Sequence, residues 1–427
     1  MNPPEFGATA ELDSKRLRSR LLTIFLIVAV DVLGYTIILP LLPFFSEHLG
    51  ASPAVVGALV STYAIFQLIA GPILGQLSDR HGRRPILLLS QIGTLAGFLL
   101  LALSRHIWML FVARAIDGAT AGNLSVAQAY ISDVTKPEQR AKSFALIGIA
   151  FGMGFTIGPA IAGFLARFGY AAPIFASCAL SLTSILCTFF LLPRREIIHD
   201  YVLDDDPGPG GKRLSLISWR EYRKYFRDPV MARLLAQWLL FGFSFATFVS
   251  GFALFAERRY LWNGHPVGVR EVGYIFAFTG FLGIIMQGGF VGRFVKWFGE
   301  RKVVRIGFIT SAFAYAAIGF SRTIVQLLWI SFGSSVGGAG LRPALTSLIT
   351  QRAGRREQGV IIGLTQSLMS IAQIMAPLIS GVLIDRLYLT TWAVWAGILA
   401  ALALFFEPAA PVIPSENRNA VAEASRV

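Results

Sequence analysis

Gly75-Gln76-Leu77-Ser78-Asp79-Arg80-His81-Gly82-Arg83-Arg84-Pro85 separates two long apolar stretches of the chain. Residues 54–74 before it are almost uncharged, and residues 86–103 after it carry no charge. The stretch itself holds one aspartate, one histidine and three arginines. A soluble protein spreads such charges over its surface. Here they predict a compact loop between two membrane-spanning helices.

The composition of the whole chain also indicates a membrane protein. Hydrophobic residues make up 55% of the 427 residues and charged residues 15%, which leaves too little polar surface for a soluble protein of this length. A helix needs about 20 apolar residues to cross a hydrocarbon core of ~30 Å. We therefore predict an all-α integral membrane protein with twelve transmembrane helices, near residues 22–44, 54–74, 86–104, 107–130, 141–166, 171–192, 232–256, 271–292, 303–320, 324–350, 360–384 and 388–406.

The net charge of +14 would suggest nucleic acid as a partner of a soluble protein, but its distribution along the chain points elsewhere. If the N-terminus is cytoplasmic, the inner segments carry 29 of the 38 Lys and Arg residues and the outer loops carry 7. This bias follows the positive-inside rule. We expect both termini to be cytoplasmic, the protein to reside in the inner membrane of the cell, and no nucleic acid to be bound.

The second half of the chain repeats the first. Gly292 and Gly299 follow Gly75 and Gly82 at an offset of 217 residues, and Lys296 stands where Asp79 stood. Such matches predict two pseudo-symmetric six-helix bundles related by duplication. The expected domains are a cytoplasmic tail at 1–20, a bundle at 21–192, a cytoplasmic central loop at 193–230, a bundle at 231–407 and a cytoplasmic tail at 408–427.

Charged residues also occur inside the predicted spans. Asp31 lies ~15 Å deep in the first span at 1.5 Å per residue, and Arg114 in the fourth span reaches a similar depth. Asp117, three residues after Arg114, shares its helix face. An isolated carboxylate at mid-membrane is costly, so Asp31 is either a proton carrier released from Arg114 on protonation or part of a structural lock. Arg114 and Asp117 either satisfy each other or complete a proton-coupling cluster with Asp31.

Four motifs together resemble those of the major facilitator superfamily, and most closely its tetracycline/proton antiporter branch. They are Gly75-x3-Asp79-Arg80-x-Gly82-Arg83-Arg84, Arg114 with Gly118, the antiporter motif Gly154-x3-Gly158-Pro159-x3-Gly163, and Asp31-x2-Gly34-x5-Pro40-x2-Pro43. The resemblance implies the major facilitator fold and a proton-coupled antiporter that exports small hydrophobic or amphipathic compounds by alternating access. The acidic residues that the tetracycline pumps carry in the third and ninth spans are absent here, so the resemblance does not extend to tetracycline as the substrate.

The resemblance also implies roles for particular residues. Asp79 is expected near the N-terminus of the eleventh span, around 359–363, and Arg83 is expected to pair with Asp133, so that the loop acts as a cytoplasmic gate. The first, fourth, seventh and tenth spans line the central cavity in this superfamily. Candidates for that cavity are Tyr35, Phe241, Ser244, Phe245, Ser334, Ser335 and Arg342. For Arg342, snorkelling to the cytoplasmic surface is the alternative.

Other functions are less well supported by the residues. The five histidines are scattered without metal-ligand spacing, and Gly337 to Gly340 is no phosphate loop because it lies within a span. We expect no enzyme activity, cofactor or metal. The partners are then a small-molecule substrate, protons and the bilayer, with basic and aromatic residues at 219–227 forming an interfacial helix on anionic inner-leaflet lipids. A monomer is expected. A metabolite uniporter or symporter, and a transporter-like receptor or scaffold, remain the alternatives.

Overall fold

The computed structural model describes residues 5–135, 137–192, 219–353 and 358–408, with the side chains of 5–18, 137–142, 144–145, 219–222 and 358–359 left undescribed. The expected C-terminal tail after residue 408 and most of the central loop lie outside the described residues. The helices of the N-terminal half are α1 (Glu5–His48), α2 (Pro53–His81), α3 (Arg83–Ala102), α4 (Ile107–Ala119), α5 (Asn123–Val134), α6 (Pro137–Leu165), the short 3₁₀ helix η1 (Ala166–Phe168) and α7 (Ala171–Leu191).

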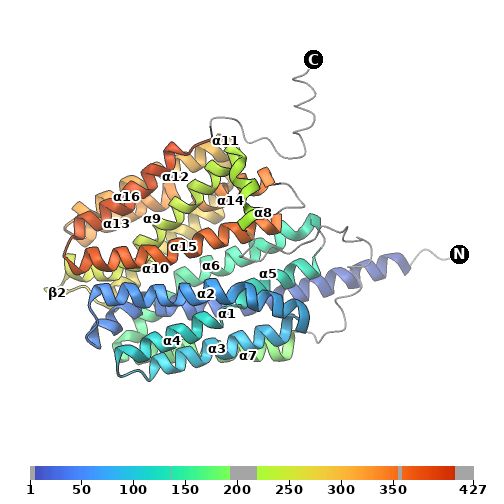
Figure 1. Cartoon of the computed structure of the whole chain (residues 1–427), viewed down its shortest axis with the longest axis horizontal. Helices are drawn as coiled ribbons and strands as arrows, with labels where there is room; N and C mark the ends of the chain where they lie inside the picture. The colour runs from blue at the N-terminus through green and yellow to red at the C-terminus, as the bar shows by residue number, and fades with distance from the viewer. Residues whose placement is uncertain (1–4, 136, 193–218, 354–357, 409–427) are drawn as a thin grey trace, which may run out of the picture. The chain divides into compact units, whose positions relative to one another are not determined.

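The C-terminal half is also helical, with one small hairpin (Figure 1). Its elements are α8 (Trp219–Arg227), α9 (Pro229–Arg259), β1 (Leu261–Trp262), β2 (His265–Pro266), α10 (Val269–Gly289), α11 (Val291–Phe298), α12 (Glu300–Phe320), α13 (Ile324–Gly338), α14 (Leu341–Ala353), α15 (Gln358–Asp385) and α16 (Leu389–Phe405). An all-α chain was expected. The two short strands form because Asn263 and Gly264 both adopt positive φ, which suits a tight antiparallel turn.

The observed helices differ from the expected ones in the start of the first span and in the continuity of the fourth and tenth. Helix α1 begins at Glu5, within the segment that was expected to be a polar tail, because residues 8–20 are rich in helix-favouring Ala, Glu, Leu, Lys and Arg. The fourth and tenth spans are each broken in two, α4 from α5 around Gly122 and α13 from α14 at Gly340. Both breaks fall where a glycine packs against a neighbouring helix, and discontinuous helices of this kind are common in transporters.

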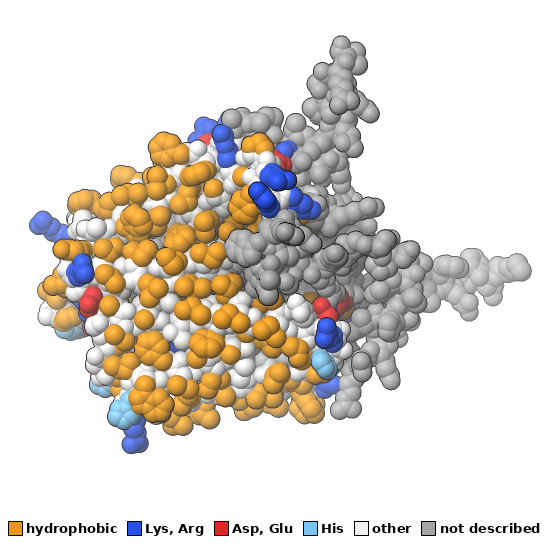
Figure 2. All heavy atoms as spheres, viewed as in Figure 1, with side chains coloured by type: hydrophobic (Ala, Val, Ile, Leu, Met, Phe, Trp, Pro, Cys, Tyr) orange, Lys and Arg blue, Asp and Glu red, His pale blue; other side chains and the backbone are white. Residues whose placement is uncertain are grey.

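Among the described residues, ten helices are long and apolar enough to cross a bilayer. The broken α4–α5 span and the shorter apolar helix α16 account for two more, which agrees with the twelve predicted spans. Figure 2 shows hydrophobic side chains over most of the visible surface, with charged side chains gathered at the ends of the helices. Phe313 and Phe405 are 76% and 82% exposed, which fits positions that face lipid rather than water. The fold class is confirmed.

The chain forms two compact units. The first contains residues 1–41 and 66–211, and the second contains 42–65 and 212–427. Residues 42–65 therefore pack with the second unit, although the sequence repeat assigned them to the N-terminal bundle. Glycines explain this packing, because a Cβ on Gly57 would come within 2.3 Å of the carbonyl oxygen of Pro377. The hydroxyl of Ser61 also donates to the carbonyl oxygen of Ile374 at 2.7 Å.

The internal repeat is visible in each unit taken by itself. Gly82 precedes α3 with φ +93° and Gly299 precedes α12 with φ +77°, a backbone conformation that is accessible essentially to glycine alone. The third and fourth spans touch where Gly93 meets Thr120. The ninth and tenth spans touch at the corresponding place, but there Thr310 supplies the side chain and Gly337 the space. The contact is preserved with its two residue types exchanged.

Candidate functional site

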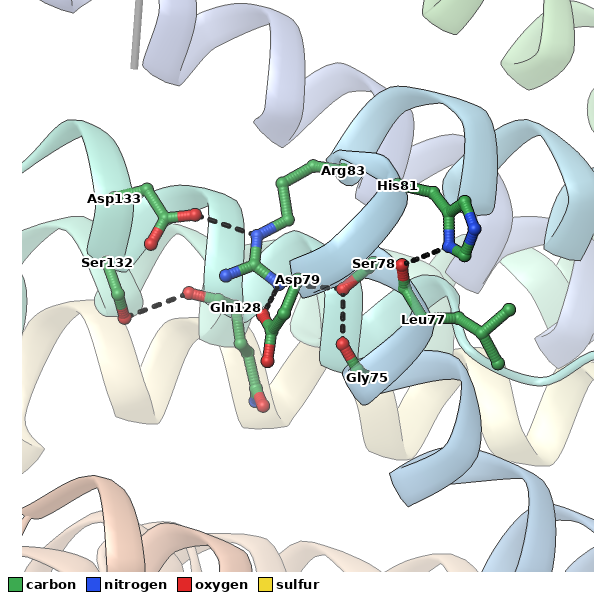
Figure 3. A network of polar contacts seen from close by, with 9 residues as sticks. All are labelled: Gly75, Leu77, Ser78, Asp79, His81, Arg83, Gln128, Ser132 and Asp133. Atoms are coloured by element: carbon green, nitrogen blue, oxygen red, sulfur yellow. Dashed lines mark hydrogen bonds and ion pairs between the residues drawn. The ribbon is translucent and has the colours of Figure 1, made fainter. Parts of the chain in front are cut away.

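Arg83 is the centre of a polar network at the end of the first unit where α2 turns into α3 (Figure 3). The left-handed backbone of Gly82 reverses the chain, so that Arg83 begins α3 and points back along α2. Its Nε donates to Oδ2 of Asp133 on α5 at 2.7 Å, and its Nη1 donates to Ser78 Oγ at 2.7 Å. The same nitrogen forms an ion pair with Asp79. The Arg83 side chain is 7% exposed, so this guanidinium is held by three partners rather than by solvent.

The structure thus brings Arg83 and Asp133 together, as the resemblance implied. The other members of the loop differ in their surroundings. Arg84 donates to the carbonyl oxygen of Phe189 at the end of α7 and lies 5.3 Å from the centre of that ring. Arg80 is exposed, and the backbone of Gly75 accepts a hydrogen bond from Ser78 at 2.7 Å. The expected position of Asp79 beside residues 359–363 concerns the other unit and stays a prediction.

Asp31 on α1 lies among uncharged polar side chains from three other helices. Its neighbours are the amide of Gln91 on α3, the amide of Asn123 on α5 and the hydroxyl of Ser184 on α7. Gln91 Nε2 donates to Ser184 Oγ at 2.7 Å, and both side chains are fully buried. Within the described part of the chain, Asp31 Oδ2 is buried without a hydrogen-bond partner. The surroundings of Asp31 therefore accommodate a neutral carboxyl group more readily than an isolated charge.

Arg114 forms an ion pair with Asp117. The two side chains of α4 are 6% and 5% exposed, and Arg114 Nη1 lies 2.7 Å from Asp117 Oδ2. Asp117 also borders α3, because a Cβ on Gly97 would lie 3.0 Å from the Asp117 Cβ. Three residues along a helix place Asp117 within reach of the guanidinium, and the expected coupling of Asp31 to Arg114 stays a prediction. Asp31 lies within electrostatic range of Asp117.

Sequence reasoning missed Gln91, Asn123 and Ser184. The available signal was that each is a polar residue in an otherwise apolar span, where polar side chains tend to bind something. A single polar residue in one helix is a weak signal, because it does not show which other helix it faces. Only the packing of α3, α5 and α7 against α1 places the three residues around one carboxylate.

The antiporter motif forms the contact between α6 and α1. A Cβ on Gly154 would come within 2.7 Å of Val32 Cγ1, and one on Gly158 within 2.2 Å of Thr36 Oγ1. Thr36 uses this closeness to donate to the carbonyl oxygen of Gly154 at 2.8 Å. Pro159 and Gly163 are buried farther along α6. The glycine face therefore holds α6 directly on the helix that carries Asp31.

The candidate cavity residues have unequal surroundings. Tyr35 is half-buried in the first unit, within electrostatic range of Arg114 and Asp117. In the second unit, Phe241 and Phe245 are half-buried and stack with ring centres 5.9 Å apart. Ser244 is buried and donates to the carbonyl oxygen of Ala396 at 2.7 Å, so its O–H is used in helix packing.

The three other candidates lie on the tenth span. Ser334 and Ser335 are half-buried, and Arg342 is exposed. Among the residues that the structure describes, no group of His, Cys, Asp or Glu side chains is arranged to hold a metal ion.

Comparison with known proteins identifies the family. The model of the Major Facilitator Superfamily matches residues 24–299 and 288–426. The chain belongs to the major facilitator superfamily. It is similar to the class B tetracycline resistance protein of Escherichia coli, with 31% identity over 87% of this chain and 90% of the relative. It is also similar to multidrug resistance protein 2 of Bacillus subtilis (strain 168), with 26% identity over 85% of this chain and 89% of the relative.

Solved structures share the fold of this superfamily member. The human organic anion transporter MFSD10 aligns with a TM-score of 0.67 over 95% of this chain and 100% of its own, at 21% identity. The nucleoside transporter NupG aligns with a TM-score of 0.71 over 90% of this chain and 98% of its own, at 14% identity. At these identities the likeness concerns the fold alone. The sequence relatives, in contrast, place the chain in the branch of drug-resistance transporters.

Proposed function

We propose that this superfamily member is a proton-coupled antiporter that exports small hydrophobic or amphipathic compounds across the inner membrane. The observation that supports this most is Asp31, a carboxylate in the middle of a span with one buried, unpartnered oxygen. A carboxylate in this setting can take up and release a proton as its access to water changes. The relatives named for tetracycline and multidrug resistance support export as the direction and drugs as the substrate class.

In this proposal each motif has a separate role. Asp31 carries the proton, and the Arg114–Asp117 ion pair on α4 interacts electrostatically with the charge of Asp31. The Arg83 network closes the cytoplasmic end of the first unit, and the glycine face of α6 lets α1 shift against it. The residues proposed to contact substrate are Tyr35 in the first unit, and Phe241, Phe245 and residues of the tenth span in the second unit. Both termini are cytoplasmic, which places the basic loop around Arg83 on the inner side.

Helix α8 fits the inner leaflet in the same orientation. Tyr225 is 5% exposed and packs into the core of the second unit, while Arg223, Lys224 and Arg227 are exposed beside it. A short helix with one buried aromatic and several exposed cations suits an anionic membrane surface. We propose that α8 anchors a monomeric transporter to acidic lipids. Equal transport activity in liposomes of neutral lipids and in liposomes that contain acidic lipids would contradict this role of α8.

The coupling is tested with the purified protein in liposomes that enclose a pH-sensitive dye. A permanently charged lipophilic dye such as ethidium is added outside, because its passive entry carries no protons. Antiport moves the compound inward and protons outward, so the lumen becomes alkaline. The Asp31→Asn variant should lose this response while retaining its expression and fold.

Each other outcome identifies an alternative. Acidification of the lumen would indicate symport, and uptake without a pH change would indicate a uniporter. No uptake of any compound in a broad panel would favour a receptor or scaffold. Tetracycline should be assayed separately within this panel, because the third and ninth spans lack the acidic residues that the tetracycline pumps carry.

A further inference from the structure

Three buried oxygen atoms near Asp31 have no hydrogen-bond donor. They are Asp31 Oδ2 on α1, Gln91 Oε1 on α3 and Asn123 Oδ1 on α5, each without a partner among the described residues. Gln91 is completely buried, and Asn123 is half-buried at the start of α5. Both amides are neighbours of the Asp31 carboxylate. Buried polar atoms in proteins are nearly always paired, so a cluster of three unpaired acceptors calls for an explanation.

The hydrogen-bonding capacity of each group explains the unpaired acceptors. An ionised carboxylate is an acceptor only, and an amide oxygen is an acceptor as well. A protonated carboxyl group, however, has one O–H donor. One proton on Asp31 Oδ2 therefore turns an acceptor into a donor and can pair it with an amide oxygen. This single change satisfies two of the three atoms, whereas an ionised Asp31 offers no donor to either amide oxygen.

The orientation of Gln91 is set by a neighbour. Its Nε2 donates one N–H to Ser184 Oγ at 2.7 Å, and Oε1 is the end of the amide without a partner among the described residues. Ser184 in turn lies 3.5 Å from the carbonyl oxygen of Ile27, one turn before Asp31 on α1. Asn123 follows Gly122, where a Cβ would come within 2.7 Å of Ser90 Oγ, so the break between α4 and α5 places its amide at this level. The two amides reach the site from separate helices.

We propose that Gln91 and Asn123 are positioning residues for the coupling proton and accept the O–H of protonated Asp31. The proton comes from water onto Asp31 Oδ2, its O–H donates to an amide oxygen, and on release it returns to water. The other titratable groups near this site are Arg114 and Asp117 on α4, Tyr35 on α1 and Cys187 on α7. Arg114 and Asp117 form an ion pair with each other, and the two amides are the uncharged groups that can accept the O–H of protonated Asp31. This inference rests on the proposed function, in which Asp31 carries the proton.

Infrared difference spectroscopy of the full-length protein in lipid nanodiscs tests this pairing directly. A spectrum at low pH minus one at high pH should contain a carboxylic acid C=O band that Asp31→Asn removes. If the acid donates to Gln91 or Asn123, Gln91→Leu should move this band to higher wavenumber, because the acid loses a hydrogen bond. Asn123→Ala should shift the C=O band in the same direction. This second variant replaces Gln91→Leu in the test if Gln91→Leu does not fold.

A matched control is available in the second unit. Gln237 is also a buried glutamine, 2% exposed, and it donates to the carbonyl oxygen of Ala403 at 3.1 Å. Gln237→Leu removes a comparable structural hydrogen bond and should leave the Asp31 band unchanged. A shift in this control of the same size as in Gln91→Leu would assign the effect to general loosening of the fold and overturn the proposal.

Two further results separate the possible failures. If proton exchange persists in Asp31→Asn, the proposed function fails at its first step. If Asp31 is essential but its band and the pH profile of transport are unchanged in both amide variants, the proposed function stands and this inference is overturned. Thermal stabilisation by Na⁺ over K⁺ that disappears in Gln91→Leu would mean that the oxygen atoms bind a metal cation instead of holding a proton, and would also overturn it.

Discussion

Arg83 donates to Asp133 at 2.7 Å, and the corresponding positions of the second unit, Glu300 and Gln351, are also joined by a hydrogen bond, at 3.0 Å. Each pair connects the first residue of a helix, α3 or α12, with the last turn of another, α5 or α14. The first unit uses an ion pair and the second uses a carboxylate with a neutral amide. The duplication has thus preserved the contact while the charge pattern diverged, which predicts unequal roles for the two loops.

The first prediction concerns this inequality. Asp79→Asn and Arg83→Ala should each reduce transport by about tenfold or more, because a hydrogen-bonded charged group contributes about 1.5–3 kcal/mol to the state in which it is paired. Lys296→Ala should have a mild effect, since Lys296 is exposed on α11. Initial rates of uptake in liposomes, normalised to the amount of inserted protein, measure the difference. Equal losses in Asp79→Asn and Lys296→Ala would refute the asymmetry.

A second prediction follows from the glycine face of α6. Gly158→Ala should lower the free energy of unfolding by about 1–3 kcal/mol, the usual cost of overpacking. The added methyl group would lie 2.2 Å from Thr36 Oγ1 and 3.0 Å from the Thr36 carbonyl carbon, and backbone cannot rotate away. Gly152→Ala on the same helix is the control, because nothing lies within 4 Å of its new Cβ. Thermal unfolding in detergent measures both. Similar midpoints for the two variants would contradict the role given to this face.

The exchanged contact of the two units allows a third prediction. Gly93→Thr alone should be destabilising, because its Cβ would meet Thr120 Cγ2 at 2.3 Å. Combining it with Thr120→Gly reproduces the arrangement of Thr310 and Gly337 and should recover most of the lost stability. In a double-mutant cycle the expected coupling is about 0.5–3 kcal/mol in favour of the pair. Additive effects of the two substitutions would show that the spans do not meet in this way.

A fourth prediction concerns the pH dependence of the pair between Asp228 and Arg352. Asp228 precedes α9 and lies outside the membrane spans. Burial acts to raise the pKa of Asp228, but two hydrogen bonds and the charge of Arg352, with the backbone N–H groups of Val230 and Met231, outweigh it and lower the pKa. A carboxylate with a lowered pKa in the folded state stabilises the fold above its unfolded pKa of about 3.9. This contribution is lost as the pH falls through the lower folded value.

The Asp228 variants separate two roles of the side chain. Asp228→Asn keeps an N-cap residue for α9 but removes the charge, and should cost about 1–3 kcal/mol at neutral pH. Asp228→Ala should cost about 1 kcal/mol more, because the cap is also lost. Unfolding followed from pH 8 downward should show a constant gap between wild type and Asp228→Asn that closes only below about pH 4. A gap that closes near neutral pH would contradict the lowered pKa.

Much of the fold followed from local patterns in the sequence. The apolar windows predicted the spans because a bilayer core demands about 20 apolar residues, whatever the neighbouring helices are. Gly82 and Gly299 were recognised from one offset, and the structure gives both the same left-handed backbone. The pair of Arg83 and Asp133 was implied by family resemblance and is present. These features depend on one or two turns of chain, or on motifs that keep their spacing.

Features that require several helices at once were not accessible in the same way. Depth along a helix placed Asp31 and Arg114 at one level but said nothing of the directions of their side chains, and Arg114 pairs with Asp117. Ser244 looked like a polar contact for substrate and is bonded to Ala396. Residues 42–65 pack with the second unit because glycines allow a close approach that the order of the chain does not reveal.

The sequence by itself therefore determined the membrane class, the spans, the duplication, the loop around Arg83 and the position of Asp31 within a span. Each of these rests on hydrophobicity, spacing or charge along one segment. Only the tertiary structure decided what surrounds that carboxylate, since Gln91, Asn123 and Ser184 come from three other helices. Hydrogen bonding acts over about 3 Å, and chain segments separated by tens of residues meet at that distance only after packing.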